Sequence, residues 1–553
     1  MKRLITLLFV GLFLVSAINA QDEPVAINIV GDVKVASSGV IYSKGAMYSN
    51  ISATGKNGHI TNEGVLNLPK GIVFVSDDTT DGTLLNKGTV SFTGAEQSDV
   101  KVIKKYSIAK RYYSISLPFD VRVGDIKDIT GNKIFDVDFY IKYYDGQSRA
   151  DNGMPESGSD PNWKWIDADN PDVITQYPDY NNYILKAGVA YFIYPNEPME
   201  IVFYANANIS DIYATQDKSI GLTFFTKKKP DSQTTEKSFG WNFVGNKQTC
   251  NFKISEDPEN CYITGDFGAA VHYYTYDTSH NVWFWKTADP NWDDILMSPY
   301  TGCFYQIGED TTLGYLKEGR DFFEGDISFR NDKKQKAYTD IIELNLDKDG
   351  ESKDLLRVIS GENYSNDFVA GEDAIKMFTP ILTNPDFYCV VNDNSVIYNK
   401  IPATQNEVPL GIRTGESGTY TIRLNTQYGY EGKNIILEDK ELNVTQDLAV
   451  ESYSFSAGKI NTKDRFVLRF ADNYTNIDNP ESGNIIVYTE NNTVYVRNIA
   501  EGDLVQIYST GGSLVKSEVA SNSEISIPLG YISGVYIVKI TGSKSLVTKV
   551  VIK

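Results

Sequence analysis

The sequence predicts an all-β chain of several domains. We expect β-sandwich-like modules, an N-terminal strand–turn region that suits a solenoid, and a C-terminal immunoglobulin-like β-sandwich. Aromatic residues make up 12% of the chain, including 36 Tyr and 26 Phe, and such residues favour strands. Short alternating segments are separated by turns that draw on 43 glycines. At 553 residues the chain is too long for one core, so three to five domains are expected.

Residues 1–20 have the organisation of a secretory signal peptide. Lys2 and Arg3 precede an apolar run over residues 4–15, and Ala20 supplies the small residue of a cleavage site. The apolar run is too short to span a bilayer stably. We therefore expect an exported chain, and no later segment of the mature sequence is long and apolar enough for a transmembrane helix.

The charge balance argues against a nucleic-acid partner. The formal net charge is −20, and removing residues 1–20 takes away Lys2 and Arg3, which leaves 50 minus 72, or −22. Nucleic-acid phosphates require patches of Lys and Arg. An acidic, solvated surface is the simplest interpretation.

The sequence offers no catalytic motif, so we expect no enzyme activity, no catalytic residue, no metal site and no cofactor. The histidines are His59, His272 and His280, and none belongs to a GxSxG or HExxH pattern. No nucleotide-binding glycine motif is present. Asp293 and Asp294 beside Trp292 are the most suggestive carboxylate pair for glycoside hydrolysis, although any chain with 72 acidic residues contains such pairs.

Four cysteines leave two alternatives open. A Cys250–Cys261 disulfide is compatible with an exported chain, because the loop between them is short. Buried free thiols at Cys250, Cys261, Cys303 and Cys389 are the other interpretation, and no metal-binding Cys/His spacing is present.

Residues 21–104 contain two similar segments, "ITNEGVLNL" (60–68) and "LLNKGTVSF" (84–92). Each has an Asn, a Gly two residues later and then an alternating strand. Asn62 and Asn86 are 24 residues apart, which suits one coil of a small solenoid. A meander of hairpins with Asn-x-Gly turns is the alternative.

The next region predicts a tandem duplication, with one β unit over 105–230 and a second over 231–330. The markers are "YYSISLPF" and "GWNFVGNK", "YYDG" and "YYTYD", and "DPNW", which occurs at 160–163 and 289–292. "AGVAYFIY" (187–194) also resembles "TGCFYQIG" (301–308). Residues 226–237 are polar and read as a joint between the units.

All six tryptophans lie in this duplicated region. In "WKW" and "WFW" the indoles are two residues apart, so each pair shares one face of a strand. Exposed, they would form a platform for a sugar ring; buried, they would form a rib of the core. The possible ligand platform consists of Trp163, Trp165, Trp283, Trp285 and Trp292.

Two further modules follow. Residues 331–474 alternate as in a β-sandwich of seven to nine strands, and Asp349-Gly350 suits a hairpin turn better than a calcium loop. Residues 471–484 are polar with Pro480 and Gly483, and we place the linker at 475–484. Residues 485–553 contain short strands up to the end of the chain, typical of a small sandwich.

Three stretches of the tail carry a family pattern: "VQIYSTGGSLVKS" (505–517), "SIPLGYISGVYIVKI" (526–540) and "TKVVIK" (548–553). On these, segment 485–553 resembles the type A C-terminal sorting domain of type IX secretion cargo. The stretch "DRFVLRF" (464–470) and its neighbours resemble the β domain that often precedes this tail. The resemblance places the sorting signal on Gly511, Gly512, Gly534, Val535, Tyr536, Lys549 and Lys553.

The resemblance implies a route rather than a chemistry. Residues 485–553 would engage the outer-membrane secretion machinery, and the linker would be cleaved during export. The product would be attached to surface lipopolysaccharide or released into the medium. We therefore expect a Gram-negative cell-surface or secreted protein with a structural, adhesive or antigenic role and a glycan or host-protein ligand. The alternatives are a carbohydrate-binding or carbohydrate-degrading protein that uses the Trp-rich units, and a passive surface-layer component.

Overall fold

The structure is a computed structural model, and its description covers part of the chain. The described residues are 5–8, 27–42, 47–49, 58–78, 81–86, 89–132, 135–153, 160–206, 220–224, 238–254, 263–264, 270–277, 282–289, 293–307, 311–315, 320–321, 332–333, 340–378, 384–430, 433–472, 485–490, 492–530, 533–543 and 546–552. The predicted joint at 226–237 and the predicted linker at 475–484 lie outside them.

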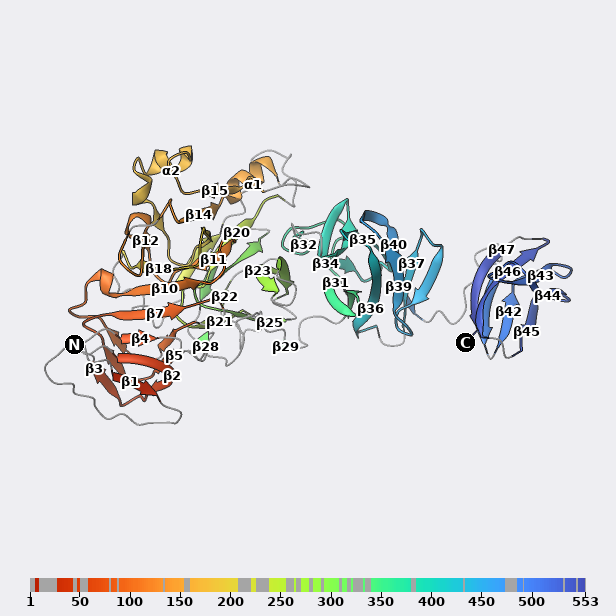
Figure 1. Cartoon of the computed structure of the whole chain (residues 1–553), viewed down its shortest axis with the longest axis horizontal. Helices are drawn as coiled ribbons and strands as arrows, with labels where there is room; N and C mark the ends of the chain where they lie inside the picture. Colours follow the sequence, from red (N-terminus) through yellow and green to blue (C-terminus); the bar gives the residue numbers. More distant parts are fainter. Residues whose placement is uncertain are drawn as a thin grey trace. The chain divides into compact units, whose positions relative to one another are not determined.

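The chain divides into two units, Met1–Phe470 and Ala471–Lys553 (Figure 1). Strands dominate both units, so the all-β prediction is confirmed. Within the described residues the α-helices are short: α1 (Gly146–Asn152) and α2 (Pro171–Gln176). In that part of the chain, no helix has the length and apolar character needed to cross a membrane.

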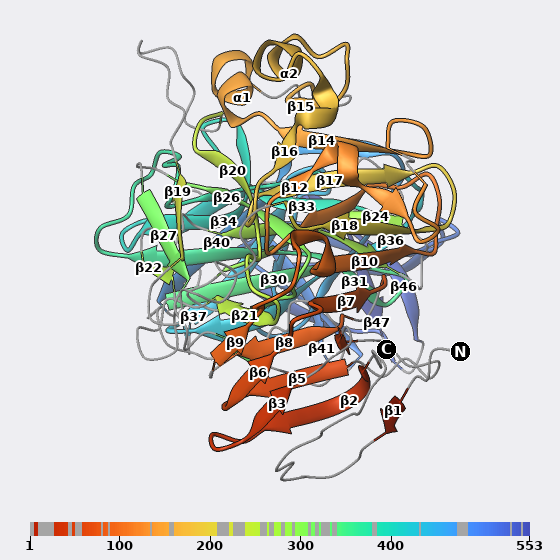
Figure 2. The same cartoon turned by 90° about the vertical axis from the view of Figure 1, so that its left-hand side faces the viewer.

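The N-terminal strands form a parallel solenoid with three ladders. Figure 2 shows β2, β5 and β8 stacked in one ladder, with β3, β6 and β9 in a second. The third ladder is β4, β7 and β10. The bounds are β2 (Ile27–Val35), β3 (Val40–Tyr42), β4 (Met47–Ser49), β5 (Gly58–Asn62), β6 (Val65–Asn67), β7 (Ile72–Ser76), β8 (Thr83–Asn86), β9 (Thr89–Ser91) and β10 (Lys101–Tyr106).

Parallel pairing selects the solenoid over the meander of hairpins, because hairpins pair antiparallel. One further strand, β1 (Ile5–Leu8), pairs in parallel with β2 and lies inside the segment that predicts a signal peptide. At the other end, β10 runs across the position of the predicted 104/105 boundary. It pairs with β7 on one side and with β18 (Met199–Tyr204) on the other, so the solenoid and the first β unit share a sheet.

An asparagine ladder links successive coils of the solenoid. Asn62 and Asn86 face each other in register in β5 and β8, and both side chains are buried. The Asn62 Nδ2 group donates to Asn86 Oδ1 at 2.7 Å and to the Thr89 backbone oxygen at 2.9 Å. The 24-residue spacing in the sequence therefore equals one coil.

The duplicated region contains two four-stranded sheets with the same strand order. Sheet I is β11 (Tyr113–Ser116), β17 (Ala190–Pro195), β14 (Phe139–Tyr144) and β15 (Trp163–Trp165). Sheet II is β20 (Trp241–Gly245), β26 (Gly302–Gln306), β23 (Val271–Asp277) and β24 (Val282–Ala288).

The register corrects one marker of the predicted duplication. Tyr144 pairs with Trp163 in sheet I, and Tyr274 pairs with Trp285 in sheet II. "WKW" (163–165) is therefore equivalent to "WKT" (285–287). The two "DPNW" segments are not equivalent, because the first leads into β15 whereas the second begins after β24 has ended.

Sheets I and II meet at a seam of small residues. Ser116 pairs with Ala190 in sheet I, and at the equivalent position of sheet II Gly245 pairs with Gly302. A Cβ atom on Gly245 would lie 1.8 Å from Ser116 Oγ, and one on Gly302 would lie 2.2 Å from the Ala190 Cβ. The Gly245 backbone N–H also donates to the Gly188 oxygen at 2.8 Å. Glycine at both positions therefore permits the contact between the sheets.

Shorter strands complete this region. They are β12 (Val121–Arg122), β13 (Lys127–Asp128), β16 (Ile184–Leu185), β19 (Ile220–Phe224), β21 (Asn251–Ile254), β22 (Ile263–Thr264), β25 (Asp293–Met297), β27 (Thr311–Tyr315), β28 (Arg320–Asp321) and β29 (Asp332–Lys333).

Residues 340–472 form one large curved sheet around an apolar core. Its strands are β30 (Asp340–Lys348), β31 (Glu351–Gly361), β32 (Ala374–Ile375), β33 (Asp386–Val391), β34 (Asn394–Pro402), β35 (Glu407–Thr414), β36 (Gly418–Tyr428), β37 (Lys433–Asp439), β38 (Val444–Asp447), β39 (Tyr453–Ala457) and β40 (Ile460–Asp472). Asp349 and Gly350 both have positive φ between β30 and β31, so they form the expected hairpin turn.

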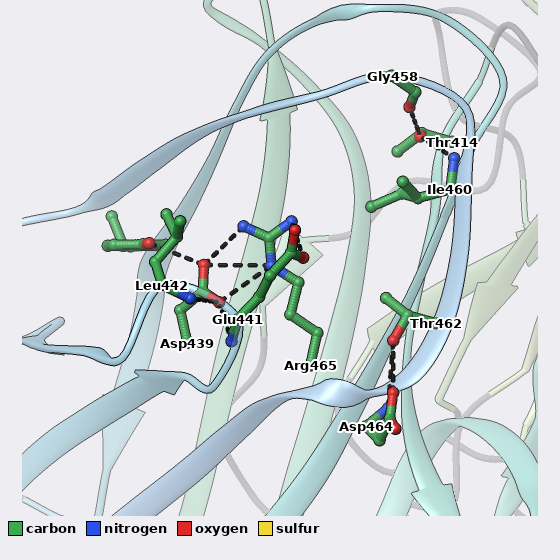
Figure 3. Close-up of polar contacts among 10 residues, drawn as sticks. Thr414, Asp439, Glu441, Leu442, Gly458, Ile460, Thr462, Asp464 and Arg465 are labelled. Atoms are coloured by element: carbon green, nitrogen blue, oxygen red, sulfur yellow. Dashed lines mark hydrogen bonds and ion pairs between the residues drawn. The ribbon is translucent and has the colours of Figure 1, made fainter.

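The buried carboxylate of Asp439 links the two ends of this sheet, and Figure 3 shows its ion pair with Arg465. Arg465 in β40 donates to Asp439 in β37 at 2.6 Å, and the Tyr453 hydroxyl from β39 donates to the same carboxylate at 2.8 Å. Strands β39 and β37 lie near opposite ends of the sheet order, so Asp439 closes the sheet on itself. Burial opposes ionisation of Asp439, but hydrogen bonds from Arg465 and Tyr453 outweigh it and hold its pKa below the usual range.

The second unit is a sandwich of a three-stranded and a four-stranded sheet. The first contains β41 (Ile486–Glu490), β42 (Thr493–Arg497) and β45 (Glu524–Pro528), and the second contains β44 (Leu514–Val519), β43 (Leu504–Ser509), β46 (Gly534–Thr541) and β47 (Leu546–Ile552). Strand β47 pairs with β46 along its whole length, so the apolar tail is the last strand of a folded module.

The asparagine ladder predicts a cost for Asn62→Ala. The substitution removes two hydrogen bonds from a buried site, so we expect the free energy of unfolding to fall by about 2 kcal/mol. Urea denaturation followed by circular dichroism measures this change. The exposed Asn152→Ala on α1 is the control and should change stability by less than about 0.5 kcal/mol. Equal stability of the two variants would show that the asparagine ladder does not stabilise the solenoid.

The closing ion pair predicts a pH-dependent stability of residues 433–470. Because the pKa of Asp439 is lower in the folded than in the unfolded chain, its contribution is full at neutral pH. It is lost as the pH falls through about 4 toward the folded-state pKa. Asp439→Asn should cost about 3 kcal/mol at pH 7 and less at pH 3. Hydrogen exchange of this segment reports the difference, and the exposed Asp464→Asn should show no such pH dependence.

Candidate functional site

One end of sheet I carries a partly exposed aromatic patch, formed by Tyr112, Tyr140, Lys142, Trp165 and Tyr194. The Lys142 Nζ lies 3.9 Å from the centre of the Trp165 ring and donates to the Tyr112 hydroxyl at 3.2 Å. The Tyr112 ring lies 5.0 Å from that of Tyr194, and Tyr140 meets Trp165 edge-on at 5.8 Å. Partial burial lowers the pKa of Lys142, against the opposing charge of Asp160.

Strand alternation explains how the patch forms. Residues two apart on β14 and β15 point to the same face, so Tyr140 and Lys142 lie beside Trp165. The signal in the sequence is the alternating run "FYIKYY" of β14. Aromatic rings beside an ammonium group offer stacking surface and a hydrogen-bond donor to a polyhydroxylated ligand.

The residues of the predicted ligand platform do not form one surface in the structure. Trp163 stacks on Phe192 at 4.2 Å and meets Phe304 of sheet II edge-on, so it belongs to the packing between the sheets. Trp285 packs against the same cluster, 5.6 Å from Phe304. Trp165 lies in the surface patch. The side chain of Trp283 and the whole of Trp292 lie outside the described residues.

The equivalent end of sheet II is covered. By register His272 corresponds to Lys142, and Trp241 corresponds to Tyr112; both side chains of sheet II are buried. The Arg149 guanidinium from α1 lies 3.9 Å from the Trp241 ring centre. The Tyr398 hydroxyl donates to the Thr287 backbone oxygen at 2.7 Å, and Thr287 corresponds to Trp165. The equivalent aromatic end is therefore open on sheet I and covered on sheet II.

The two described histidines, His59 and His272, each lie beside a threonine hydroxyl. Burial lowers the pKa of His272 to about 3, with Arg149 and Lys376 contributing, so its ring is neutral at physiological pH. His59 Nδ1 is 2.6 Å from the Thr83 hydroxyl. His280 lies outside the described residues.

The cysteine alternatives stay open. Cys250, Cys303 and Cys389 are buried, Cys303 and Cys389 are free thiols, and burial raises the pKa of Cys303 to about 12. Cys261 lies outside the described residues, so a Cys250–Cys261 disulfide remains a prediction. Within the described residues no cluster of His, Cys, Asp or Glu is arranged to hold a metal ion.

The C-terminal unit presents a second distinctive surface, on the outer face of β46 and β47. Val535 pairs with Val551, and Ile537 pairs with Lys549. Val551 is 51% exposed, and Val547 on the same face is 63% exposed. Together with Lys539 these side chains form what we name the terminal apolar–basic face: Val535, Ile537, Lys539, Val547, Lys549 and Val551.

The residues of the predicted sorting signal take different places in this unit. Val535 and Lys549 belong to the terminal apolar–basic face, whereas Tyr536 points inward and is buried. Gly511 and Gly512 form the turn between β43 and β44, where Gly512 has a φ of +81°. Gly534 begins β46, and Lys553 lies outside the described residues.

Comparisons with known proteins give little functional guidance. Residues 325–470 match the family model "Domain of unknown function (DUF8693)". No curated protein matches the chain.

Two solved structures show distant likeness. One is described as PorZ, an essential bacterial surface component of the type-IX secretion system of human oral-microbiomic Porphyromonas gingivalis. It has 13% identity and a TM-score of 0.12, over 56% of this chain and 43% of that chain. The other, a biofilm associated protein BSP domain, has 11% identity and a TM-score of 0.13, over 75% of this chain and 59% of that one. The chain thus spans less than two thirds of either structure, and these scores assign no function.

Proposed function

We propose that this protein is an exported surface component without catalytic activity, delivered by type IX secretion through residues 485–553 and acting by contact. The terminal apolar–basic face is the observation that carries the proposal. Val547 and Val551 are exposed on β47, an edge strand of its sheet. Exposed apolar side chains on an edge strand invite association, and monomeric domains usually avoid them. A docking platform for the secretion machinery accounts for them.

The module's own fold supports this role. Its apolar core is formed from residues of the unit itself, so the unit can fold before or apart from the rest of the chain. Lys539 and Lys549 flank the apolar side chains and favour a partner with an acidic rim around an apolar centre. In this proposal the predicted signal peptide directs the chain across the inner membrane. The C-terminal module, which resembles a sorting domain, then directs it across the outer membrane.

The proposal predicts the ends of the mature chain and the effect of a charge on the docking face. Mass spectrometry of material from the cell surface or medium should find a chain that begins near Gln21 and ends within 471–484. Val547→Asp with Val551→Asp should leave the protein in the periplasm with its tail intact, because two buried carboxylates would oppose docking.

Ser526→Asp on the opposite sheet of the module is the matched control and should be exported normally. Surface delivery of the double variant would count against the docking face. An intact residue 553 on a periplasmic wild-type chain would contradict sorting altogether.

A second candidate function is glycan binding at the patch on sheet I. Trp165 is partly exposed beside Lys142, whereas Trp163 packs against Phe192 and sheet II, so the ligand role that we propose for "WKW" rests on its second indole. We expect Trp165→Ala to weaken binding on a glycan array by about tenfold, and Trp165→Phe to weaken it less. Asp464→Asn should leave binding unchanged. Release of reducing sugar by the wild-type chain would contradict a non-catalytic role.

A further inference from the structure

A buried cluster of charged side chains lies in the large sheet formed by residues 340–472. Lys376 follows β32, and its ammonium group lies between Asp354 of β31 and Asp386 of β33 in the network of ion pairs. The side chains of Lys376 and Asp386 are 4% and 2% exposed, and that of Asp354 is 13% exposed. Three segments of the chain thus bring one amine and two carboxylates together, largely out of solvent.

The two carboxylates have different surroundings. Lys376 Nζ donates directly to Asp354 Oδ2 and lies 3.7 Å from Asp386 Oδ1. Arg413 binds the other oxygen of Asp386, because its Nε donates to Oδ2 at 2.8 Å. The Arg413 guanidinium lies 4.6 Å from the centre of the Phe378 ring. Asp386 therefore has a second cation beside it, and Asp354 is the direct partner of the lysine.

The carboxyl group of Asp354 is arranged to accept a nucleophile. The backbone N–H of Phe387 donates to Oδ2 at 2.7 Å, and that of Leu355 donates to Oδ1 at 3.0 Å. Such donors stabilise the negative charge that develops on the oxygens when the carboxyl carbon is attacked. Burial raises the pKa of Asp354, and the charge of Asp386 adds to the shift, against the opposing effect of Lys376. Burial thus favours the neutral acid that the attack requires.

We propose that Lys376 and Asp354 condense into an intramolecular isopeptide bond. A proton passes from the Lys376 ammonium to the Asp354 carboxylate, which gives a neutral amine and a neutral acid. Nζ then attacks Cγ, the C–N bond forms and the Cγ–OH bond breaks. Asp386 accepts the second proton from Nζ and delivers it to the leaving hydroxyl, so one water is released and no oxidant or cofactor is consumed.

The bond would link two parts of the sheet that are 22 residues apart in the sequence. It would join β31 covalently to the segment after β32. Covalent closure of a loop restricts the unfolded chain, as a disulfide does, and so stabilises the folded state. The inference does not depend on the route of export or on glycan binding.

A second buried lysine provides an internal comparison. Lys104 in β10 donates to Ser76 Oγ at 2.6 Å and to the Asp77 backbone oxygen at 2.9 Å, and its Nζ lies 3.7 Å from Asp81. A hydroxyl and a backbone carbonyl thus hold this amine, whereas a carboxyl group holds the amine of Lys376. We expect no covalent bond at Lys104.

Mass spectrometry of the full chain tests the proposal. After denaturation and reduction, the wild-type chain should lie one water, about 18 Da, below the mass calculated from its ends. Fragmentation of a tryptic digest should locate the bond, because the linked peptide has two N-termini, at Asp354 and at Val358. Peptides that end at Lys104 should be recovered without a link. A wild-type chain at its full calculated mass would show an ordinary ion pair and overturn the proposal.

Variants assign the chemistry to individual groups. Lys376→Arg keeps the positive charge but removes the nucleophilic amine, so we expect its full calculated mass. Asp354→Asn keeps an acyl group and should still form the bond, now with loss of ammonia, about 17 Da. Asp386→Asn should leave most of the chain without the bond. Lys353→Arg, beside Glu351, is the matched control and should retain the loss of water.

Two results would contradict the assignment of residues. Loss of water from Lys376→Arg would place the dehydration elsewhere in the chain and overturn the proposal. Complete bond formation in Asp386→Asn would overturn the proton transfer through that carboxylate. Thermal unfolding followed by circular dichroism adds a readout of the fold, and we expect a lower melting temperature for Lys376→Arg than for Lys353→Arg.

Discussion

The close contact of sheets I and II determines the arrangement of the duplicated region. Gly245 and Gly302 leave no room for a Cβ atom against Ser116 and Ala190, so the two sheets meet backbone to backbone at equivalent positions. Interiors are close-packed, and side chains of any size at this seam would push the sheets apart. The aromatic residues around the seam then pack between the sheets. Trp163 and Phe304 meet there because the small residues permit it.

Because the two sheets pack against each other, residues at equivalent positions of sheets I and II have different surroundings. Both sheets carry an aromatic end, but Arg149 covers Trp241 on sheet II, whereas the ring contacts described for Trp165 on sheet I come from Tyr112, Tyr140 and Lys142. A duplicated scaffold can thus keep one copy for internal packing and leave the other to contact a partner. This division supports a binding surface on sheet I without requiring any catalytic group.

Local patterns in the sequence predicted strands, turns and the coil length well, because these depend on residues close in the chain. Asn62 and Asn86 pair in register as the spacing suggested, and Asp349-Gly350 forms its hairpin. The sequence could not predict which indole packs between the sheets and which lies in the surface patch. Trp163 and Trp165 share a strand face, and they differ only in their position relative to sheet II.

Strands β46 and β47 of the terminal module carry apolar side chains on both faces, and the two faces have different explanations. The inward side chains of β46 and β47, such as Tyr536, Val538 and Val550, form the core that the fold requires. The fold does not require Val547 and Val551 to be apolar, because polar residues at those positions would keep the alternation and improve solubility. An apolar outer face on an edge strand is useful only if something covers it for part of the protein's life. The transient docking that we propose during export would satisfy this condition, since cleavage afterwards would remove the exposed face.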